Sequence, residues 1–127
     1  MTLPTPDNGL RRYARQTVLP EIGPTGQAAL AQARVLVLGC GALGSLTAEL
    51  LARAGAGFLR LVDRDVPELD NLHRQMLYDE DDVRERRPKA VAAAARLQRI
   101  NSALMVEPLA VDANPANIAS LVQGMTL

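Results

Sequence analysis

A glycine-rich turn is the clearest candidate for a binding site in this sequence. Residues 39–44 read GCGALG, a GxGxxG pattern that follows an apolar run and precedes leucines at helical spacing. In such a turn the first glycine allows a tight bend, the second lets the backbone approach phosphate oxygens, and the third lets helix and strand pack closely. The helix N-terminus also favours an anion. We expect a phosphate site formed by Gly39, Gly41, the amide of Ala42, and Gly44; the alternative is a tight turn without a ligand.

A carboxylate follows at the spacing where the ribose of a nucleotide would lie. Asp63 comes directly after a second apolar run, 58–62, about 20 residues past the glycine turn. A carboxylate in this place can accept hydrogen bonds from ribose hydroxyls, although a solvated loop acid is the simpler alternative. Up to this point an NAD-dependent dehydrogenase explains the sequence equally well.

A polar segment and a later lysine favour a triphosphate. Residues 70–75 read DNLHRQ, and Lys89 follows an acidic loop. Asn71, Arg74 and Gln75 supply hydrogen-bond donors, and the arginine and the lysine carry positive charges that suit the phosphates of a nucleotide. Hydride transfer needs no such clamp. Taken alone, a charged and solvated loop is the commoner explanation for a run of this kind.

Alternating strands and helices would position these residues. The run 34–38, RVLVL, is apolar and rich in β-branched residues, which predicts a strand buried on both faces. A helix follows the glycine turn, with Leu46, Leu50 and Leu51 at helical spacing, before the second strand at 58–62. The later elements are a loop with a turn of helix at 63–87, a helix at 89–100, a strand at 104–111 and a helix at 116–122. This order predicts an α/β fold with a Rossmann-like, doubly wound, mostly parallel sheet, present as its first, nucleotide-binding half only.

Residues 1–33 are expected to form an N-terminal helical arm. Residues 10–19 carry basic and apolar side chains at roughly helical spacing, and residues 25–33 are good helix formers with Thr25 available as a cap. Residues 34–127 would then be the N-terminal half of a domain that is incomplete at its C-terminus. We expect one edge or face of that half to be open.

Composition excludes several classes of function. The 127 residues include 14 basic and 14 acidic side chains, so no overall field attracts nucleic acid or an anionic membrane. Aromatic residues are 2%, too few for platforms that stack nucleic-acid bases. No secretory signal or membrane-spanning run is visible, so we expect a cytoplasmic protein. The single cysteine, Cys40, cannot by itself build a disulfide or a structural zinc site, and no metal site is expected among these residues.

Seven motifs stand in an order that resembles the MoeB, ThiF and HesA family of adenylating enzymes. They are RYARQ at 12–16, GPTGQAAL at 23–30, RVLVLGCGALGS at 34–45, LVDRD at 61–65, DNLHRQ at 70–75, PK at 88–89 and RIN at 99–101. The same order marks the adenylation half of ubiquitin-activating enzymes. The resemblance covers about four-fifths of the chain, and the joint occurrence of these motifs is specific.

The resemblance implies that the nucleotide is ATP. The glycine turn would bind its phosphates, and Asp63 would hold the ribose. Asn71 and Arg74 would contact ribose and phosphates, Gln75 belongs to the same motif, and Lys89 would neutralise phosphate charge. The C-terminal carboxylate of a ubiquitin-like sulfur-carrier protein, of the MoaD or ThiS kind, would then attack the α-phosphate. The products would be an acyl-adenylate and pyrophosphate, as in molybdopterin or thiamine biosynthesis.

The resemblance also implies a homodimer. The family arginine that matches Arg15 reaches the ATP of the neighbouring subunit, so Arg15, Arg74 and Lys89 are the expected catalytic residues. Two other reactive side chains are set aside. A thiol at a helix N-terminus can have a lowered pKa, but Cys40 would sit under the phosphates, where a small packing residue suffices. His73 is a poor candidate for a general base, because a carboxylate nucleophile is already ionised at neutral pH.

The chain departs from the family at points that keep alternatives open. Asp70 stands where serine is usual, and Arg86 replaces a common glycine. An additional carboxylate near the phosphates is unfavourable for nucleotide binding. The ligand for the magnesium ion that accompanies ATP is expected beyond residue 127. A truncated, non-catalytic nucleotide-binding or dimerisation module is therefore the second hypothesis, and an NAD-binding domain is the third.

Overall fold

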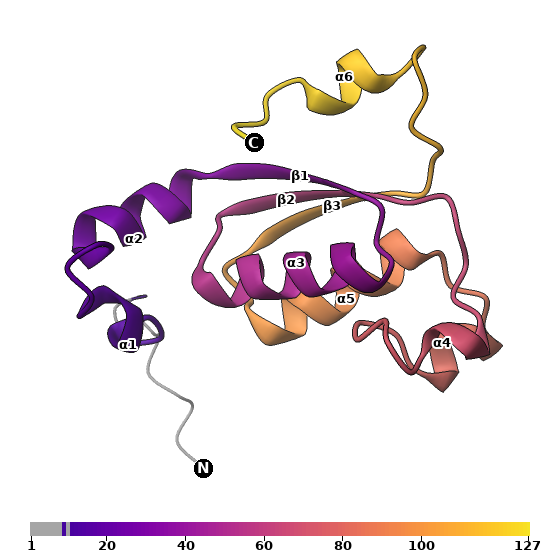
Figure 1. The fold of residues 1–127 in the computed structure, drawn as a ribbon, viewed down its shortest axis with the longest axis horizontal. Coiled ribbons are helices and arrows are strands. Elements are labelled where there is room, and N and C mark those ends of the chain that lie inside the picture. Colours follow the sequence, from indigo (N-terminus) through magenta and orange to yellow (C-terminus); the bar gives the residue numbers. More distant parts are fainter. Residues whose placement is uncertain (1–8, 10) are drawn as a thin grey trace.

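Three parallel strands form the centre of the structure, a computed structural model that describes residue 9 and residues 11–127 (Figure 1). The strands are β1 (Arg34–Leu38), β2 (Phe58–Val62) and β3 (Met105–Leu109), in the order β1-β2-β3. Both neighbouring pairs are parallel, and Val37 lies opposite Leu61 in the register. The expected α/β class with a parallel sheet is confirmed.

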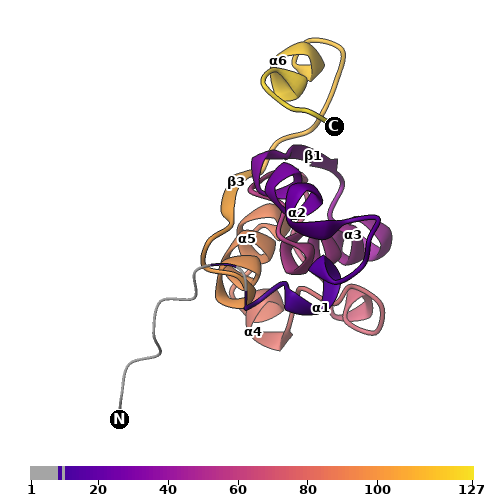
Figure 2. The same ribbon diagram turned by 90° about the vertical axis from the view of Figure 1, so that its left-hand side faces the viewer.

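The burial of β1 differs from the expectation. Val35 and Val37 are buried, but Leu38, on the other face, is 50% exposed. The helices α3 (Ala42–Ala54) and α5 (Lys89–Ile100) cover one face of the sheet, whereas only the short helix α6 (Ile118–Val122) lies beyond the other (Figures 1 and 2). The expected burial on both faces is therefore wrong for β1, because the second face has little to cover it.

Small side chains form the fully buried part of α3, and the partly buried Leu51 packs against the core as well. Ser45, Ala48 and Ala52 face the core at spacings of three and four residues, while Leu50 is 58% exposed. Small residues let the helix approach the sheet closely, and α5 uses the same device with a row of buried alanines. The leucine spacing predicted the helix correctly, and the structure shows which of its faces packs against the sheet.

The N-terminal segment forms two short helices, α1 (Ala14–Thr17) and α2 (Gly23–Gln32). Helix α1 is shorter than the expected helical segment at 10–19, whose first residue lies outside the described residues. Thr25 does not cap α2, because the helix begins two residues earlier with Pro near its start, where a missing N–H is tolerated. The division of the chain into an arm, 1–33, and a half-domain, 34–127, stays a prediction.

Glutamines from the arm cap the C-terminal end of α3. The carbonyl of Ala54 accepts hydrogen bonds from Gln16 Nε2 at 2.6 Å and from Gln27 Nε2 at 3.0 Å, and Gln16 also donates to Gln27 Oε1. The last carbonyls of a helix lack partners within the helix, so these contacts both satisfy α3 and hold the arm. RYARQ and GPTGQAAL thus have a structural role that the sequence analysis did not assign.

A buried asparagine completes this junction. Asn101, which follows α5 and is 1% exposed, donates through Nδ2 to the Tyr13 hydroxyl at 2.8 Å and to the Ala52 carbonyl at 2.9 Å. The asparagine of the RIN motif therefore connects α5, α3 and the arm.

The last residues of the chain run along the free edge of β1. The amide of Leu36 donates to the Leu127 carbonyl at 2.9 Å, and the amide of Thr126 donates to the Arg34 carbonyl at 2.7 Å. The edge that we expected to be open is therefore partly covered. No helix in the described part of the chain is long and apolar enough to span a bilayer.

Candidate nucleotide site

The glycine turn joins β1 to α3 with the geometry that its pattern predicts. Gly39 has a φ of +86°, a left-handed conformation that favours glycine. A Cβ built on Gly44 would lie 1.7 Å from the Gly39 carbonyl oxygen, so only glycine fits there. At Gly41 a Cβ would meet nothing closer than Gln75 Nε2, at 3.8 Å, which leaves this backbone open to approach. Among the described residues no side chain caps the N-terminus of α3, so the helix amides at this turn are available to a ligand.

Asp63 lies beside the glycine turn, at the carboxyl end of β2. Its Oδ2 accepts a hydrogen bond from the Cys40 amide at 2.8 Å, and its Oδ1 accepts one from the Asp65 amide at 2.7 Å. Asp63 also lines a cavity of about 200 Å³ with Gly39 and Asp112. The carboxylate therefore holds the turn in place, and each oxygen keeps a lone pair that a ribose hydroxyl could use.

Gln75 is the most informative side chain of the site. It is 5% exposed, and its Nε2 faces Gly41. Its Oε1 is buried and has no hydrogen-bond partner in the part of the chain that the structure describes. Buried acceptors are rarely left unpaired in proteins, because desolvation then goes uncompensated. Its Nε2 makes no hydrogen bond within the described chain and faces the glycine turn, so it can donate to a phosphate oxygen of a ligand.

Substituting Gln75 should separate stability from binding. We expect Gln75→Met to raise the free energy of unfolding of the ligand-free chain by about 1 kcal/mol, because it removes an unpaired buried acceptor, and to weaken nucleotide binding about tenfold. Urea unfolding and calorimetric titration would measure the two effects. Gln27→Met is the matched control: Gln27 is also buried, but both ends of its amide are paired, so this variant should be destabilised. Equal stability changes in the two variants would contradict the prediction.

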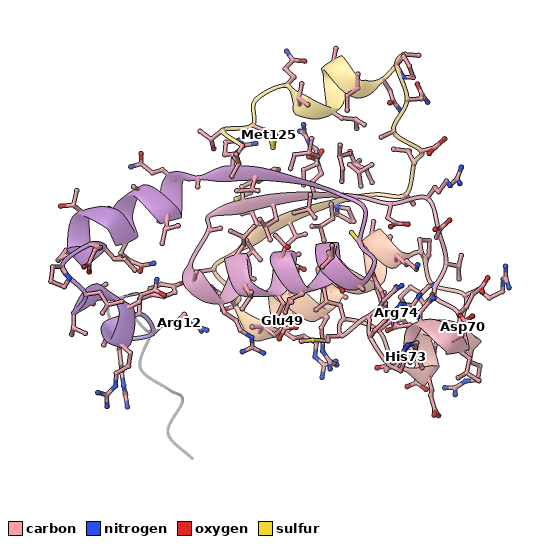
Figure 3. All side chains as sticks on the ribbon, in the orientation of Figure 1. Arg12, Glu49, Asp70, His73, Arg74 and Met125 are labelled. Atoms are coloured by element: carbon pink, nitrogen blue, oxygen red, sulfur yellow. The ribbon has the colours of Figure 1, made fainter. Side chains whose placement is uncertain are left out.

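Asn71 and Arg74 lie on the loop after β2, which contains a 3₁₀ turn, η1 (Leu69–Asn71), and a short helix, α4 (Glu80–Arg84). Asn71 Oδ1 accepts from the Glu68 amide at 2.9 Å, and Arg74 Nη1 donates to the Asp70 carbonyl at 2.7 Å. Figure 3 shows Arg74 beside Asp70 and His73 on this loop. The arginine is held by backbone and is exposed to solvent.

Lys89 begins α5 and borders a second, polar cavity. Its amide donates to the Asp65 carbonyl at 2.9 Å, and the residue is 7% exposed. The cavity has a volume of about 410 Å³ and is lined by Arg64, Asp65, Val66, Pro67, Glu68, Asn71, Arg86 and Lys89. Asn71 and Lys89 are therefore brought to one site, although they are far apart in the sequence.

Arg15 is not part of this site. It is exposed on α1, at the end of the sheet opposite the glycine turn (Figure 1). Within the described part of the chain, no cluster of three or more His, Cys, Asp or Glu side chains could hold a metal ion.

The sequence pattern of the ThiF family matches residues 13–127 of this chain. The chain belongs to the ThiF family. It is 47% identical over 116 residues to the sulfur carrier protein ThiS adenylyltransferase of Bacillus subtilis, a match that covers 91% of this chain and 34% of that protein. It is 42% identical to the sulfur carrier protein adenylyltransferase of Thermus thermophilus, covering 90% of this chain and 41% of that one.

Solved structures agree with the fold of this ThiF-family chain. The crystal structure of the E. coli dehydratase TcdA in complex with ATP has a TM-score of 0.85 and 30% sequence identity, and the match covers 98% of this chain and 49% of that one. The structure of PaaA has a TM-score of 0.86 at 32% identity, over 99% of this chain and 44% of that one. The chain thus spans about half of these proteins or less.

Cys40 of the ThiF-family turn is unsuited to nucleophilic chemistry. It is fully buried, and burial, with the nearby Asp63 carboxylate, raises the pKa of its thiol from 9.0 to about 12. Tyr78, which the sequence analysis missed, donates its hydroxyl proton to the Cys40 carbonyl at 2.5 Å, and burial raises the pKa of this hydroxyl as well. The sequence contains two tyrosines, and this rarity was the one feature that could have drawn attention to Tyr78. His73 is exposed on the loop after β2 (Figure 3).

The Cys40 pKa predicts alkaline instability. The folded chain keeps the thiol proton at pH values where the unfolded thiol loses it, so this stabilisation is complete below pH 9 and is lost as the pH rises from 9 to about 12. We expect the free energy of unfolding, measured with urea at about pH 8 and about pH 10, to fall more in the parent chain than in Cys40→Ala. An equal fall in both would assign the effect to Tyr78 and other groups instead.

Proposed function

We propose that this chain is the nucleotide-binding part of an enzyme that uses ATP to adenylate the C-terminus of a ubiquitin-like sulfur-carrier protein. The open backbone of Gly41 in the glycine turn, with the donor Nε2 of Gln75 facing it, is the observation that carries this proposal. A polar cavity with Lys89 on its wall adds a place for phosphate charge. The names of the Bacillus and Thermus relatives support a sulfur carrier as substrate, and the ATP complex of TcdA supports the nucleotide.

Each site residue has a proposed role. The turn amides would bind phosphate oxygens, two polar groups would hold the ribose, and two cations would neutralise phosphate charge. The residues are, in that order, Gly39, Gly41, Ala42 and Gly44 for the turn; Asp63 and Asn71 for the ribose; and Arg74 and Lys89 for the phosphates, with Gln75 Nε2 donating to a phosphate oxygen. A magnesium ligand beyond residue 127 stays a prediction. A cytoplasmic location of the protein stays a prediction as well.

The proposed reaction is a substitution at phosphorus. A carboxylate oxygen of the carrier forms a bond to the α-phosphorus of ATP, the bond to the β-phosphate oxygen breaks, and pyrophosphate leaves. Negative charge builds on the leaving group, so cations held at the phosphates lower the barrier. The chain's own contribution is to bind and orient the triphosphate and to stabilise this charge; no proton needs to be removed from the carboxylate.

Arg15 is proposed to act in a homodimer. Its exposed position, far from the glycine turn of its own chain, suits a contact with the ATP of a second subunit. The test would combine Arg15→Ala with Lys89→Ala subunits: mixed dimers should regain activity, because one of their two sites has both residues intact.

Carrier-dependent exchange of pyrophosphate into ATP tests the function. The unsubstituted protein should catalyse this exchange. Lys89→Ala should lower both the exchange rate and the affinity for ATP by roughly 10- to 100-fold, since it removes a charge-assisted contact to phosphate. Lys89→Arg should keep part of both. ATP binding without any exchange would favour the non-catalytic module, and a preference for NADH over ATP would contradict the proposal.

A further inference from the structure

Arg86 has an unusual backbone conformation at the edge of the polar cavity. Among the described residues it is the one non-glycine residue with a positive φ, at +51°. The turn between α4 and α5 requires this conformation, with the Arg86 amide bonded to the Val83 carbonyl at 3.2 Å and the Arg87 amide bonded to the Asp82 carbonyl at 3.0 Å. An L side chain there costs folding free energy that glycine would not. Strain of this kind is often kept where the side chain has a function.

The charge of Arg86 is not used within the fold. Its neighbour Arg87 pairs with Asp82 at 2.6 Å and with Glu85, so these carboxylates already have a partner. No ion pair or side-chain hydrogen bond involves Arg86 in the part of the chain that the structure describes, and the residue is exposed. Within the described chain, no ion pair or hydrogen bond of the Arg86 side chain therefore offsets the cost of this backbone conformation.

Arg86 determines the charge balance of the cavity. The lining has three cations, Arg64, Arg86 and Lys89, against two carboxylates, Asp65 and Glu68. Arg64 Nε lies 3.7 Å from Asp65 Oδ1, and Arg64 Nη1 lies 3.6 Å from Oδ2 of a third carboxylate, Asp112, so two carboxylates already lie beside this cation. Without Arg86 the formal charge of the lining would be zero. Arg86 thus supplies the net positive charge that a polyphosphate needs.

We propose that Arg86 is a further nucleotide-binding residue, whose guanidinium binds the phosphate chain of a nucleoside triphosphate in the cavity beside Lys89. The inference rests on the proposed function and extends it. A planar guanidinium can bind two phosphate oxygens at once, and it keeps its charge at any working pH. Because the contact is to phosphate, it strengthens binding with each added phosphate and contributes nothing to binding of the nucleoside alone.

Four variants of the protein as encoded test the inference. Arg86→Gly removes both the charge and the strain, Arg86→Gln removes the charge alone, and Arg86→Lys keeps the charge. Arg84→Gln is the control: it removes a cation two residues away that pairs with Asp81 and does not line the cavity. The dissociation constants for ATP, AMP and adenosine would be measured by calorimetric titration, and the melting temperature without ligand by scanning calorimetry.

The inference predicts a specific pattern. Arg86→Gly and Arg86→Gln should weaken ATP binding about tenfold, AMP binding less, and adenosine binding not at all, whereas Arg86→Lys and Arg84→Gln should stay close to the parent. Arg86→Gly alone should raise the melting temperature, by about 3 °C, because glycine relieves the positive φ. A purely structural role would change the affinity for ATP and for adenosine by the same factor.

The outcomes separate this inference from the proposed function. If the parent binds ATP and Arg86→Gly binds ATP equally well, Arg86 is not a phosphate ligand. The same conclusion follows if Arg86→Gly loses affinity for ATP and for adenosine by the same factor. If the parent binds no ATP, the proposed function is overturned and the inference with it. Weaker ATP binding by Arg84→Gln to the same extent would show a general surface-charge effect and would also overturn the inference.

Discussion

Gly44→Ala is expected to destabilise the folded chain by roughly 3 kcal/mol or more and to abolish nucleotide binding. The added Cβ would lie 1.7 Å from the Gly39 carbonyl oxygen and 2.8 Å from its carbon. Both atoms are backbone, so no side chain can rotate away. Relief requires α3 to move from β1, which disrupts the packing of Ser45 and Ala48 against the sheet. Urea unfolding monitored by circular dichroism would measure the loss.

Gly41→Ala is the matched control in the same turn. Its Cβ would lie 3.8 Å from Gln75 Nε2, an ordinary van der Waals distance, and Gly41 has a negative φ of −84°. We expect the free energy of unfolding to change by less than about 1 kcal/mol, while ATP affinity falls because a methyl group now occupies the place where phosphate would approach. If Gly44→Ala proved as stable as Gly41→Ala, the close contact between α3 and β1 would be wrong.

Asn101→Ala is expected to destabilise the chain by about 3 kcal/mol, the second large effect. The side chain is almost fully buried and joins three parts of the fold through hydrogen bonds to the Tyr13 hydroxyl, the Ala52 carbonyl and the Ala103 amide. Alanine would leave a buried carbonyl at the end of α3 without this donor and would open a cavity. The melting temperature and the free energy of unfolding are the measurements.

A double-mutant cycle with Tyr13→Phe assigns this effect. Tyr13→Phe removes one hydroxyl and keeps the ring, so it should cost about 1 kcal/mol. The double variant should lose less free energy of unfolding than the sum of the two single-variant losses, because both substitutions remove the same Tyr13–Asn101 hydrogen bond. Strict additivity would contradict the contact. The cycle also tests whether the Tyr13–Asn101 hydrogen bond holds the arm, which carries Arg15, against the rest of the chain.

Part of the fold was predictable from local signals. The RVLVL run gave β1 at Arg34–Leu38, and the helix-forming run after Pro88 gave α5 at Lys89–Ile100. The glycine turn predicted close packing of α3 against β1 and an accessible backbone at Gly41, because each glycine of a GxGxxG pattern stands where a side chain would strain the turn, clash with neighbouring residues or block a ligand. These features depend on propensity and on contacts between residues close in sequence, so they can be recognised without the fold.

Other features depended on which surfaces meet. Leucines at helical spacing predicted α3 but did not show that its alanines face the sheet, because helical periodicity alone does not say which face of a helix meets the sheet. Asp63 was expected to bind ribose, and its two bonds to backbone amides arise from where β2 ends relative to the turn. Such choices require the positions of elements that are distant in sequence.

The sequence by itself determined the order of strands and helices and the glycine turn, and it supplied the polar residues proposed to act with that turn, because these are encoded in short runs. Tertiary structure alone decided that Gln75 Nε2 faces Gly41 while its Oε1 is buried, and that Arg86 lines the same cavity as Lys89. It also placed helix α1, which carries Arg15, at the end of the sheet opposite the glycine turn (Figure 1). Burial, hydrogen-bond pairing and cavity lining result from contacts across the sheet and its loops, which no local pattern of residues specifies.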